Sequence, residues 1–323
     1  MTKRTEYGIL QDVHPSIPGP EILPATGSSS KGATNMNAIQ AALLGLVQGI
    51  GEFLPISSSG HLLLGRMVLG LNIDQTSGAY HMLDILLHVG TLIPVLIVFW
   101  KDWWEILKNP FKSKTLLLLF IASLPTLVVK FIFDDFIDGA NTGWFLGVSF
   151  LMTAVFLLVA EQVSAKKKQR ADKPGFLHAI VMGCMQGIAL LPGVSRSGST
   201  LAGGLLSGLE RKSAAKFSFM MSAPAIAGAL LLEGKDAIEN GWFRDLQVLP
   251  TLLGVVVAGV SGYLAIRFML KLISRVSLNW FALYVAILGV AFLVLQLLGF
   301  PGVPDFAPPA QEAAALLSAC LIA

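Results

Sequence analysis

Charged residues are scarce in this chain. Only 13% of its 323 residues are Asp, Glu, Lys or Arg, whereas 54% are hydrophobic and the mean hydropathy is +0.70. Soluble domains carry roughly 25% charged residues. A water-soluble globule of this length would therefore have too few charged side chains to cover its surface. A chain surrounded by lipid needs no such cover, and the shortage therefore predicts an integral membrane protein.

Cysteine and net charge are also low. The two cysteines, Cys184 and Cys320, lie far apart in apolar stretches, so we expect no disulfide framework and no structural zinc. The formal net charge is only +3, and the Lys and Arg residues form short clusters between apolar runs. This pattern excludes a nucleic-acid partner and is typical of residues that set membrane topology.

Changes in polarity along the chain divide it into three segments. Residues 1–37 are polar, rich in Pro, Gly, Ser and Thr, and lack the apolar core of a signal peptide, so we predict a disordered N-terminal extension. Residues 38–300 are expected to form one membrane-embedded domain, and residues 301–323 a C-terminal tail.

Six apolar segments have about the length needed to cross a hydrocarbon layer of roughly 30 Å. They are residues 83–100, 115–133, 144–160, 217–232, 248–268 and 280–298. Two other apolar stretches, 38–71 and 176–209, are interrupted by Pro, Ser and Gly, and their arms are too short to span. Irregular backbone at membrane depth needs protein or a water-filled cavity around it. The predicted fold class is therefore all-α, with six transmembrane helices and two re-entrant helix hairpins.

The loops alternate in charge. Segments 101–114, 161–175 and 267–279 are basic, whereas the loops near 134–138 and 233–245 are mainly acidic. Because basic loops stay in the cytoplasm, the three basic segments are predicted to be cytoplasmic and the acidic loops external.

The two interrupted stretches are related by an internal repeat. When the sequence is shifted by 138 residues, 12 of the 31 positions in 41–71 are identical to those in 179–209. Each hairpin precedes three spans, an odd number, so the second repeat (176–298) is predicted to be inverted relative to the first (38–160). Inverted repeats with broken helices place their polar loops together near the midplane, and we expect a site built from both loops.

Both loops contain groups that are costly inside a membrane and therefore indicate function. Residues 48–61 (QGIGEFLPISSSGH) include Glu52 and His61, and residues 192–200 (PGVSRSGST) include Arg196. Helix N-termini bind phosphate through their free N–H groups, and a guanidinium suits phosphate oxygens. The hydroxyl groups expected to complete a phosphate-binding site belong to Ser57, Ser59, Ser195, Ser197 and Thr200.

Catalytic roles can be assigned to the same stretches. Glu52 and His61 could activate a nucleophile and protonate a leaving group. The nucleophile could be Ser58, with His61 as its base, or a water molecule directed by Glu52. Gln48 lies four residues before Glu52 on one helix face, and the two are expected to hold a divalent cation, Mg²⁺ or Ca²⁺, through oxygen.

Structural roles compete with these interpretations. Glu52 and Arg196 could form only a buried ion pair between the hairpins, His61 could be a packing residue, and the repeat-paired serines could cap helices. The remaining polar residues are expected to be structural: His81, His88 and His178, which lack polar neighbours in the sequence, and Asp84 and Glu161, which should snorkel or pair near span ends.

The two motifs resemble the signatures of the undecaprenyl-diphosphate phosphatase family, also called the bacitracin-resistance family, and the resemblance extends over about 38–300. It implies removal of the terminal phosphate of undecaprenyl diphosphate in the bacterial inner membrane, from its outer side, which returns the monophosphate carrier lipid to cell-wall synthesis. The family's motif residues fall on Gln48, Glu52, Ser58, His61, Arg196 and Thr200. Where the family has Glu or Gln, this chain has Gln48, which should weaken metal ligation. The resemblance leaves open whether the protein forms a homodimer.

Two other functions fit part of the pattern. Lipid phosphatases of the phosphatidic-acid type also contain Ser-Gly-His, but they need a second His six residues after their Arg, where this chain has Ala202. A polyprenyl-phosphate transporter or flippase is the alternative, because inverted repeats with re-entrant loops are common in transporters. Transport, however, does not require the cluster of Glu52, Ser58 and His61.

Overall fold

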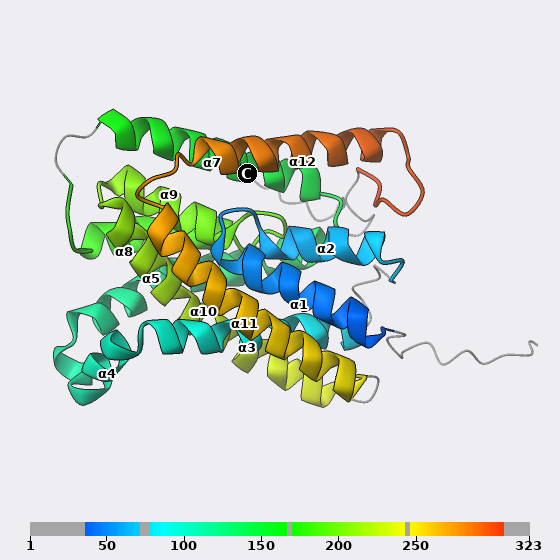
Figure 1. Cartoon of the computed structure of the whole chain (residues 1–323), viewed down its shortest axis with the longest axis horizontal. Helices are drawn as coiled ribbons and strands as arrows, with labels where there is room; N and C mark the ends of the chain where they lie inside the picture. The colour runs from blue at the N-terminus through cyan, green and yellow to red at the C-terminus, as the bar shows by residue number, and fades with distance from the viewer. Residues whose placement is uncertain (1–35, 72–77, 167–169, 243–245, 307–323) are drawn as a thin grey trace, which may run out of the picture. The chain divides into compact units, whose positions relative to one another are not determined.

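The computed structural model describes residues 36–71, 78–166, 170–242 and 246–306. Within these ranges the regular structure is helical (Figure 1): α1 (Ala38–Phe53), α2 (Ser58–Val68), α3 (Gly78–Val98), α4 (Trp100–Lys108), a 3₁₀ turn (Pro110–Lys112), α5 (Lys114–Ile132), α6 (Asp134–Ala140), α7 (Leu146–Lys166), α8 (Phe176–Ile188), α9 (Arg196–Ser207), α10 (Arg211–Glu239), α11 (Val248–Leu272) and α12 (Asn279–Leu297). Most of the predicted extension and tail lies outside the described ranges.

Six of these helices are long and apolar enough to cross a membrane: α3, α5, α7, α10, α11 and α12. The prediction of a multi-span membrane protein is confirmed. Several span boundaries differ from the predicted ones; α7, for example, ends at Lys166 instead of at residue 160. The first span ends at Val98, and the chain continues after Phe99 as the separate helix α4; the fourth span, α10, extends beyond the predicted 217–232 at both ends.

Both interrupted stretches form helix–loop–helix hairpins, α1 with α2 and α8 with α9. The arms have 16, 11, 13 and 12 residues, and at about 1.5 Å per residue none reaches 30 Å. The re-entrant depth of these hairpins and the inverted orientation of the halves stay predictions.

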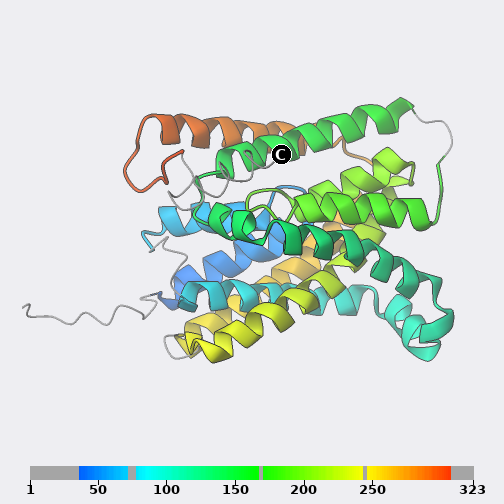
Figure 2. The ribbon, with the colours of Figure 1, turned by 180° about the vertical axis from the view of Figure 1, so that it is seen from behind.

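The hairpin helices of each half pack against spans of the other half. Hairpin helix α1 packs on α11 of the second half, and hairpin helix α8 packs on α5 of the first half. The third spans, α7 and α12, lie side by side in both views (Figures 1 and 2). The largest buried cluster accordingly joins residues of both halves, among them Phe53, Leu157, Met182, Phe219 and Met269. Two equivalent halves packed on each other give this pattern.

Equivalent glycines of the repeat lie at two close helix crossings. A Cβ atom on Gly45 would lie 2.2 Å from the carbonyl oxygen of Gly254, and one on Gly183 would lie 2.2 Å from that of Ala122. Small residues allow backbones to approach closely in membrane proteins, where lipid supplies no hydrophobic force between helices. These glycines set how far each hairpin helix sinks into the other half.

Gly45→Ala and Gly183→Ala should therefore both destabilise the protein, by about 1–3 kcal/mol for an overpacked contact. Gly228→Ala is the matched control, because a Cβ there meets nothing within 4 Å and alanine favours helix. Thermal unfolding in detergent measures the difference. Equal midpoints for Gly45→Ala and the control would contradict this explanation of the crossing.

Candidate functional site

The two hairpin loops meet, as the repeat predicts. The hydroxyl of Ser197 donates to the carbonyl oxygen of Leu54 at 2.8 Å, and the backbone N–H of Gly193 donates to Oγ of Ser59 at 3.2 Å. Each loop therefore supplies one serine that bonds to the backbone of the other, and the site contains residues of both halves.

Glu52 is the centre of the side-chain cluster at this junction. Its Oε1 accepts from the guanidinium of Arg196, and its Oε2 accepts from Oγ of Ser58 at 2.7 Å and from Nε2 of Gln48 at 3.1 Å. Glu52 is 6% exposed and Arg196 is 16% exposed. The contact between Gln48 and Glu52 agrees with their predicted common helix face. The ion pair between the hairpins, which the sequence suggests as a structural role, is present.

Ser58 and Arg196 are each the first residue of a helix, α2 and α9. Through Glu52 the two helix N-termini are brought to one place. Because each N-terminus carries partial positive charge and N–H groups without intrahelical partners, the pair favours an anion. Arg196 adds a full positive charge, so the arrangement suits a phosphate group better than a neutral ligand.

Ser57 and Ser195 cap these helices. The hydroxyl of Ser57 accepts from the N–H of Gly60 at 3.3 Å, and that of Ser195 accepts from the N–H of Gly198 at 3.0 Å. Both serines therefore have the helix-capping role that the sequence suggests as the alternative to phosphate binding. Ser57 also has a φ of 74°, a conformation that costs a non-glycine residue of order 1–3 kcal/mol and that clusters at functional sites.

Thr200, which is predicted to help bind phosphate, faces into the protein. Its hydroxyl donates to the carbonyl oxygen of Arg196 at 2.8 Å and lies 2.6 Å from Oγ of Ser218. Arg196 also donates to the carbonyl oxygen of Ser218, at 3.3 Å. Thr200 and Ser218 therefore fix the first turn of α9 against α10 and, with it, the position of the guanidinium.

His88 also belongs to the cluster, although no sequence signal near it marks it as a site residue. It lies on α3, and its Nε2 is 3.7 Å from Oε2 of Glu52. Its Nδ1 is 2.7 Å from the carbonyl oxygen of Asp84, and because a carbonyl only accepts, Nδ1 is the donor. His88 is expected to be structural because it lacks polar neighbours in the sequence, but its polar neighbour Glu52 lies on a different helix, α1.

His61 lies in the same hairpin but has other partners. Its Nδ1 donates to the carbonyl oxygen of Ser57 at 2.7 Å, and its Nε2 lies 2.8 Å from the hydroxyl of Tyr284, on which the ring also stacks. Both ring nitrogens are thereby engaged. The structure brings Glu52, and not His61, to the hydroxyl of Ser58.

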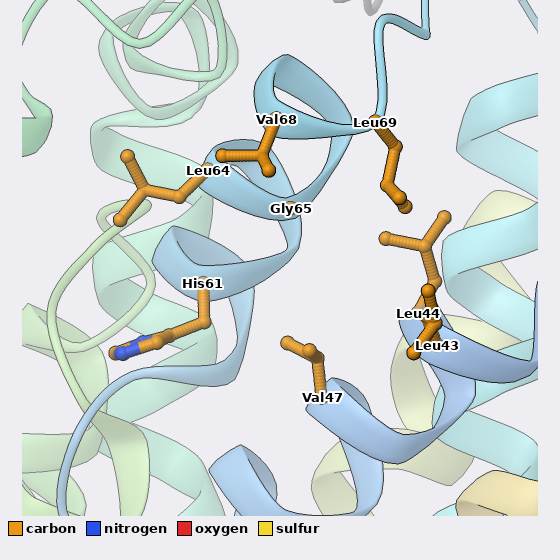
Figure 3. A pocket seen from close by; sticks show the side chains of 8 residues that line it. All are labelled: Leu43, Leu44, Val47, His61, Leu64, Gly65, Val68 and Leu69. Carbon is orange, nitrogen blue, oxygen red and sulfur yellow. The ribbon is translucent and has the colours of Figure 1, made fainter. Parts of the chain in front are cut away.

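An apolar cavity of about 300 Å³ lies between α1 and α2, with His61 among its lining residues (Figure 3). Apolar residues supply the rest of the lining: Leu43, Leu44, Val47, Leu64, Gly65, Val68 and Leu69. Apart from His61 this lining is apolar, so the cavity suits a hydrocarbon chain.

The other polar residues expected to be structural have partners. Asp84 pairs with Arg66, and Glu161 pairs with Arg211, so both carboxylates form ion pairs as predicted. His178 accepts from the backbone N–H of Gly175 at 3.0 Å and caps α8.

The predicted cation site consists of Gln48 and Glu52. The part of the chain that the structure describes contains no group of three or more His, Cys, Asp or Glu side chains able to share a metal ion. Oε1 of Gln48 is nevertheless buried without a hydrogen-bond partner, while Nε2 of the same amide donates to the carboxylate of Glu52. Mg²⁺ takes one or two protein ligands and completes its shell with water and substrate phosphate. Gln48 and Glu52 fit a cation of that kind.

Much of the chain is similar to known proteins. The family described as "Bacitracin resistance protein BacA" matches residues 41–291. Proteins named undecaprenyl-diphosphatase from Carboxydothermus hydrogenoformans and Halothermothrix orenii are 42% and 39% identical over 82% and 80% of this chain and 99% and 98% of their own. One from Rubrobacter xylanophilus is 40% identical over 81% of this chain and 100% of its own. With six candidate spans and both motifs joined at one buried cluster, this chain belongs to the BacA bacitracin resistance protein family.

Proposed function

We propose that this protein hydrolyses undecaprenyl diphosphate to undecaprenyl phosphate and inorganic phosphate, the reaction named for its relatives. It thereby recycles the carrier lipid for peptidoglycan synthesis in the bacterial inner membrane and confers resistance to bacitracin. The observation that carries this proposal is Glu52, which binds both the hydroxyl of Ser58 and the guanidinium of Arg196. A serine beside a base, next to an anion site, is an arrangement for phosphoryl transfer.

Ser58 is the proposed nucleophile and Glu52 its base. Oγ of Ser58 attacks the terminal phosphorus, Glu52 takes the hydroxyl proton, and the bond from phosphorus to the bridging oxygen breaks. Undecaprenyl phosphate leaves, and water then hydrolyses the phosphoserine to release inorganic phosphate. The 2.7 Å contact between Ser58 and Glu52 supports this assignment. Water attacking directly, with Glu52 as its base, is the competing route.

Arg196 is proposed to change partner when substrate binds. In the structure its guanidinium bonds to Glu52, and an incoming phosphate carries the same charge as that carboxylate. Transfer of the guanidinium to phosphate oxygens would leave Glu52 free to accept a proton and would stabilise the charge on the transferring group. A divalent cation held by Gln48 and Glu52 would add further charge neutralisation.

The lipid chain is proposed to occupy the groove between α1 and α2. The groove is lined by apolar side chains and includes His61, three residues after Ser58. With the first hairpin entering from outside, as the charge pattern predicts, the groove runs from His61 toward the outer end of α2. This direction supports entry of the substrate from the periplasmic side.

Purified protein in detergent should release inorganic phosphate from a polyprenyl diphosphate when Mg²⁺ or Ca²⁺ is present. Glu52→Ala and Arg196→Lys should each lower kcat/KM by about 100-fold or more, because they remove the base and the planar fork. Arg267→Ala, an exposed arginine on α11, is the control and should leave phosphate release unchanged. Thermal unfolding verifies that each variant is folded. Absence of release by the wild type would instead favour a transporter.

Ser58→Ala distinguishes the two mechanisms. A serine nucleophile predicts nearly complete loss of phosphate release and, in the wild type, a phosphoserine that rapid acid quench and mass spectrometry detect on the peptide containing Ser58. Partial activity in Ser58→Ala without any trapped phosphoserine would contradict the covalent route and support attack by water.

His88 is proposed to position the carboxylate of Glu52. His88→Leu removes a polar partner of a charged group and should lower kcat/KM by about 10- to 100-fold, with KM changed less than kcat. His88→Gln keeps a hydrogen-bonding side chain and should restore much of the loss. If both variants lose equal activity, or if neither loses any, His88 does not act through Glu52.

A further inference from the structure

The segment that follows the first span has three distinct faces. Helix α4 begins at Trp100, two residues after α3 ends, and leads through the 3₁₀ turn to Lys114 at the start of α5. We refer to residues 100–114 as the α4 elbow. It lies at one edge of the molecule in both views (Figures 1 and 2), far along the chain from either hairpin motif.

One face of the elbow is fixed to the protein. Ile106 is buried in the large core cluster, and Trp103 packs against that cluster while its indole N–H donates to the carbonyl oxygen of Val95 at 3.4 Å. Asp102 accepts from the ammonium group of Lys216 on α10 at 2.5 Å. These contacts hold α4 in one orientation, so its other faces are presented in a defined direction.

A second face is aromatic and exposed. The rings of Trp100 and Trp104 stack with their centroids 5.7 Å apart, yet the residues are 56% and 46% exposed. Leu107 lies on the same side of the helix and is also exposed, and Phe111 in the following turn is fully exposed. Trp at the end of a membrane span is typical of the boundary between acyl chains and headgroups.

The third face is basic. All four lysines of the elbow, Lys101, Lys108, Lys112 and Lys114, are exposed. Nζ of Lys108 lies 5.5 Å from the ring centre of Trp104, so the basic and aromatic faces adjoin. The elbow contains two acidic residues, of which Asp102 is bonded to Lys216 and Glu105 is exposed. Positive charge therefore predominates on the outward side.

We propose that the α4 elbow binds the headgroups of anionic phospholipids in the leaflet that the charge pattern predicts to be cytoplasmic. An interfacial helix inserts aromatic and aliphatic side chains at the acyl boundary and places lysines at the level of the phosphates. Anionic lipid attracts each lysine near the surface, whereas zwitterionic lipid does not. The adjacent aromatic and basic faces match that layering, and charge complementarity selects anionic lipid as the occupant.

Tryptophan quenching by brominated lipids tests the proposal in vesicles of the whole protein. Brominated phosphatidylglycerol, mixed with unlabelled phosphatidylcholine, should quench wild-type fluorescence more than brominated phosphatidylcholine mixed with unlabelled phosphatidylglycerol in the same molar ratio. Lys101→Ala combined with Lys108→Ala should abolish most of this excess. Lys173→Ala combined with Lys271→Ala is the matched control, because it removes two exposed lysines from other predicted cytoplasmic segments and should retain the excess.

A reporter variant and an activity measurement complete the test. Trp100→Phe combined with Trp104→Phe keeps the aromatic face but removes its two stacked, exposed indoles, and it should lose the excess quenching. Phosphate release by the lysine variants, which lie outside the hairpin cluster, should remain at the wild-type level and verifies folding. The proposal is overturned if the wild type shows no preference for phosphatidylglycerol. Equal loss in both lysine pairs would also overturn it, because the attraction would then be spread over the whole basic side.

Discussion

The buried ion pair between Glu52 and Arg196 constrains the rest of the structure. One charge comes from the first hairpin and the other from the second, and both are largely removed from water. Removal of one partner from such a pair typically costs about 3–5 kcal/mol, because the other charge is left buried and uncompensated. Each hairpin alone would therefore contain a buried charge without a partner. The bonds from Ser197 to Leu54 and from Gly193 to Ser59 lie at the same junction, so the halves must assemble before any of these groups is satisfied.

The ion pair requires each hairpin helix to pack closely against the opposite half. Gly45 on α1 and Gly183 on α8 permit this by removing the side chain at each crossing. Because they are equivalent in the repeat, the same solution serves both halves, and it aligns the loop of each hairpin with that of the other. Packing, and not hydrophobic force, must hold helices together in lipid, which explains why close backbone contacts accompany the polar junction.

Much of this arrangement was predictable from the sequence because its determinants are local or repeated. Hydropathy locates the spans, the repeat indicates that the loops meet, and spacing on one helix face places Gln48 beside Glu52. Contacts between distant segments were not predictable. His88 follows Glu52 by 36 positions on another helix, so nothing near it in the sequence marks it as part of the cluster. The proximity of Ser58 and His61 suggested a base, but the loop conformation directs His61 toward Tyr284. The separate helix α4 was missed because an apolar run shows its length and not the break at Phe99.

The structural and catalytic interpretations of Glu52 and Arg196 are compatible. The two carboxylate oxygens have different partners: Oε1 binds the guanidinium, and Oε2 binds the hydroxyl of Ser58. A phosphate that replaced the carboxylate at Arg196 would leave the contact to Ser58 in place. It would also lie near the N-termini of α2 and α9, which favour negative charge as Arg196 does. The anion would then bridge the hairpins in place of Glu52, so the loops would remain joined while the freed carboxylate accepts the proton of Ser58.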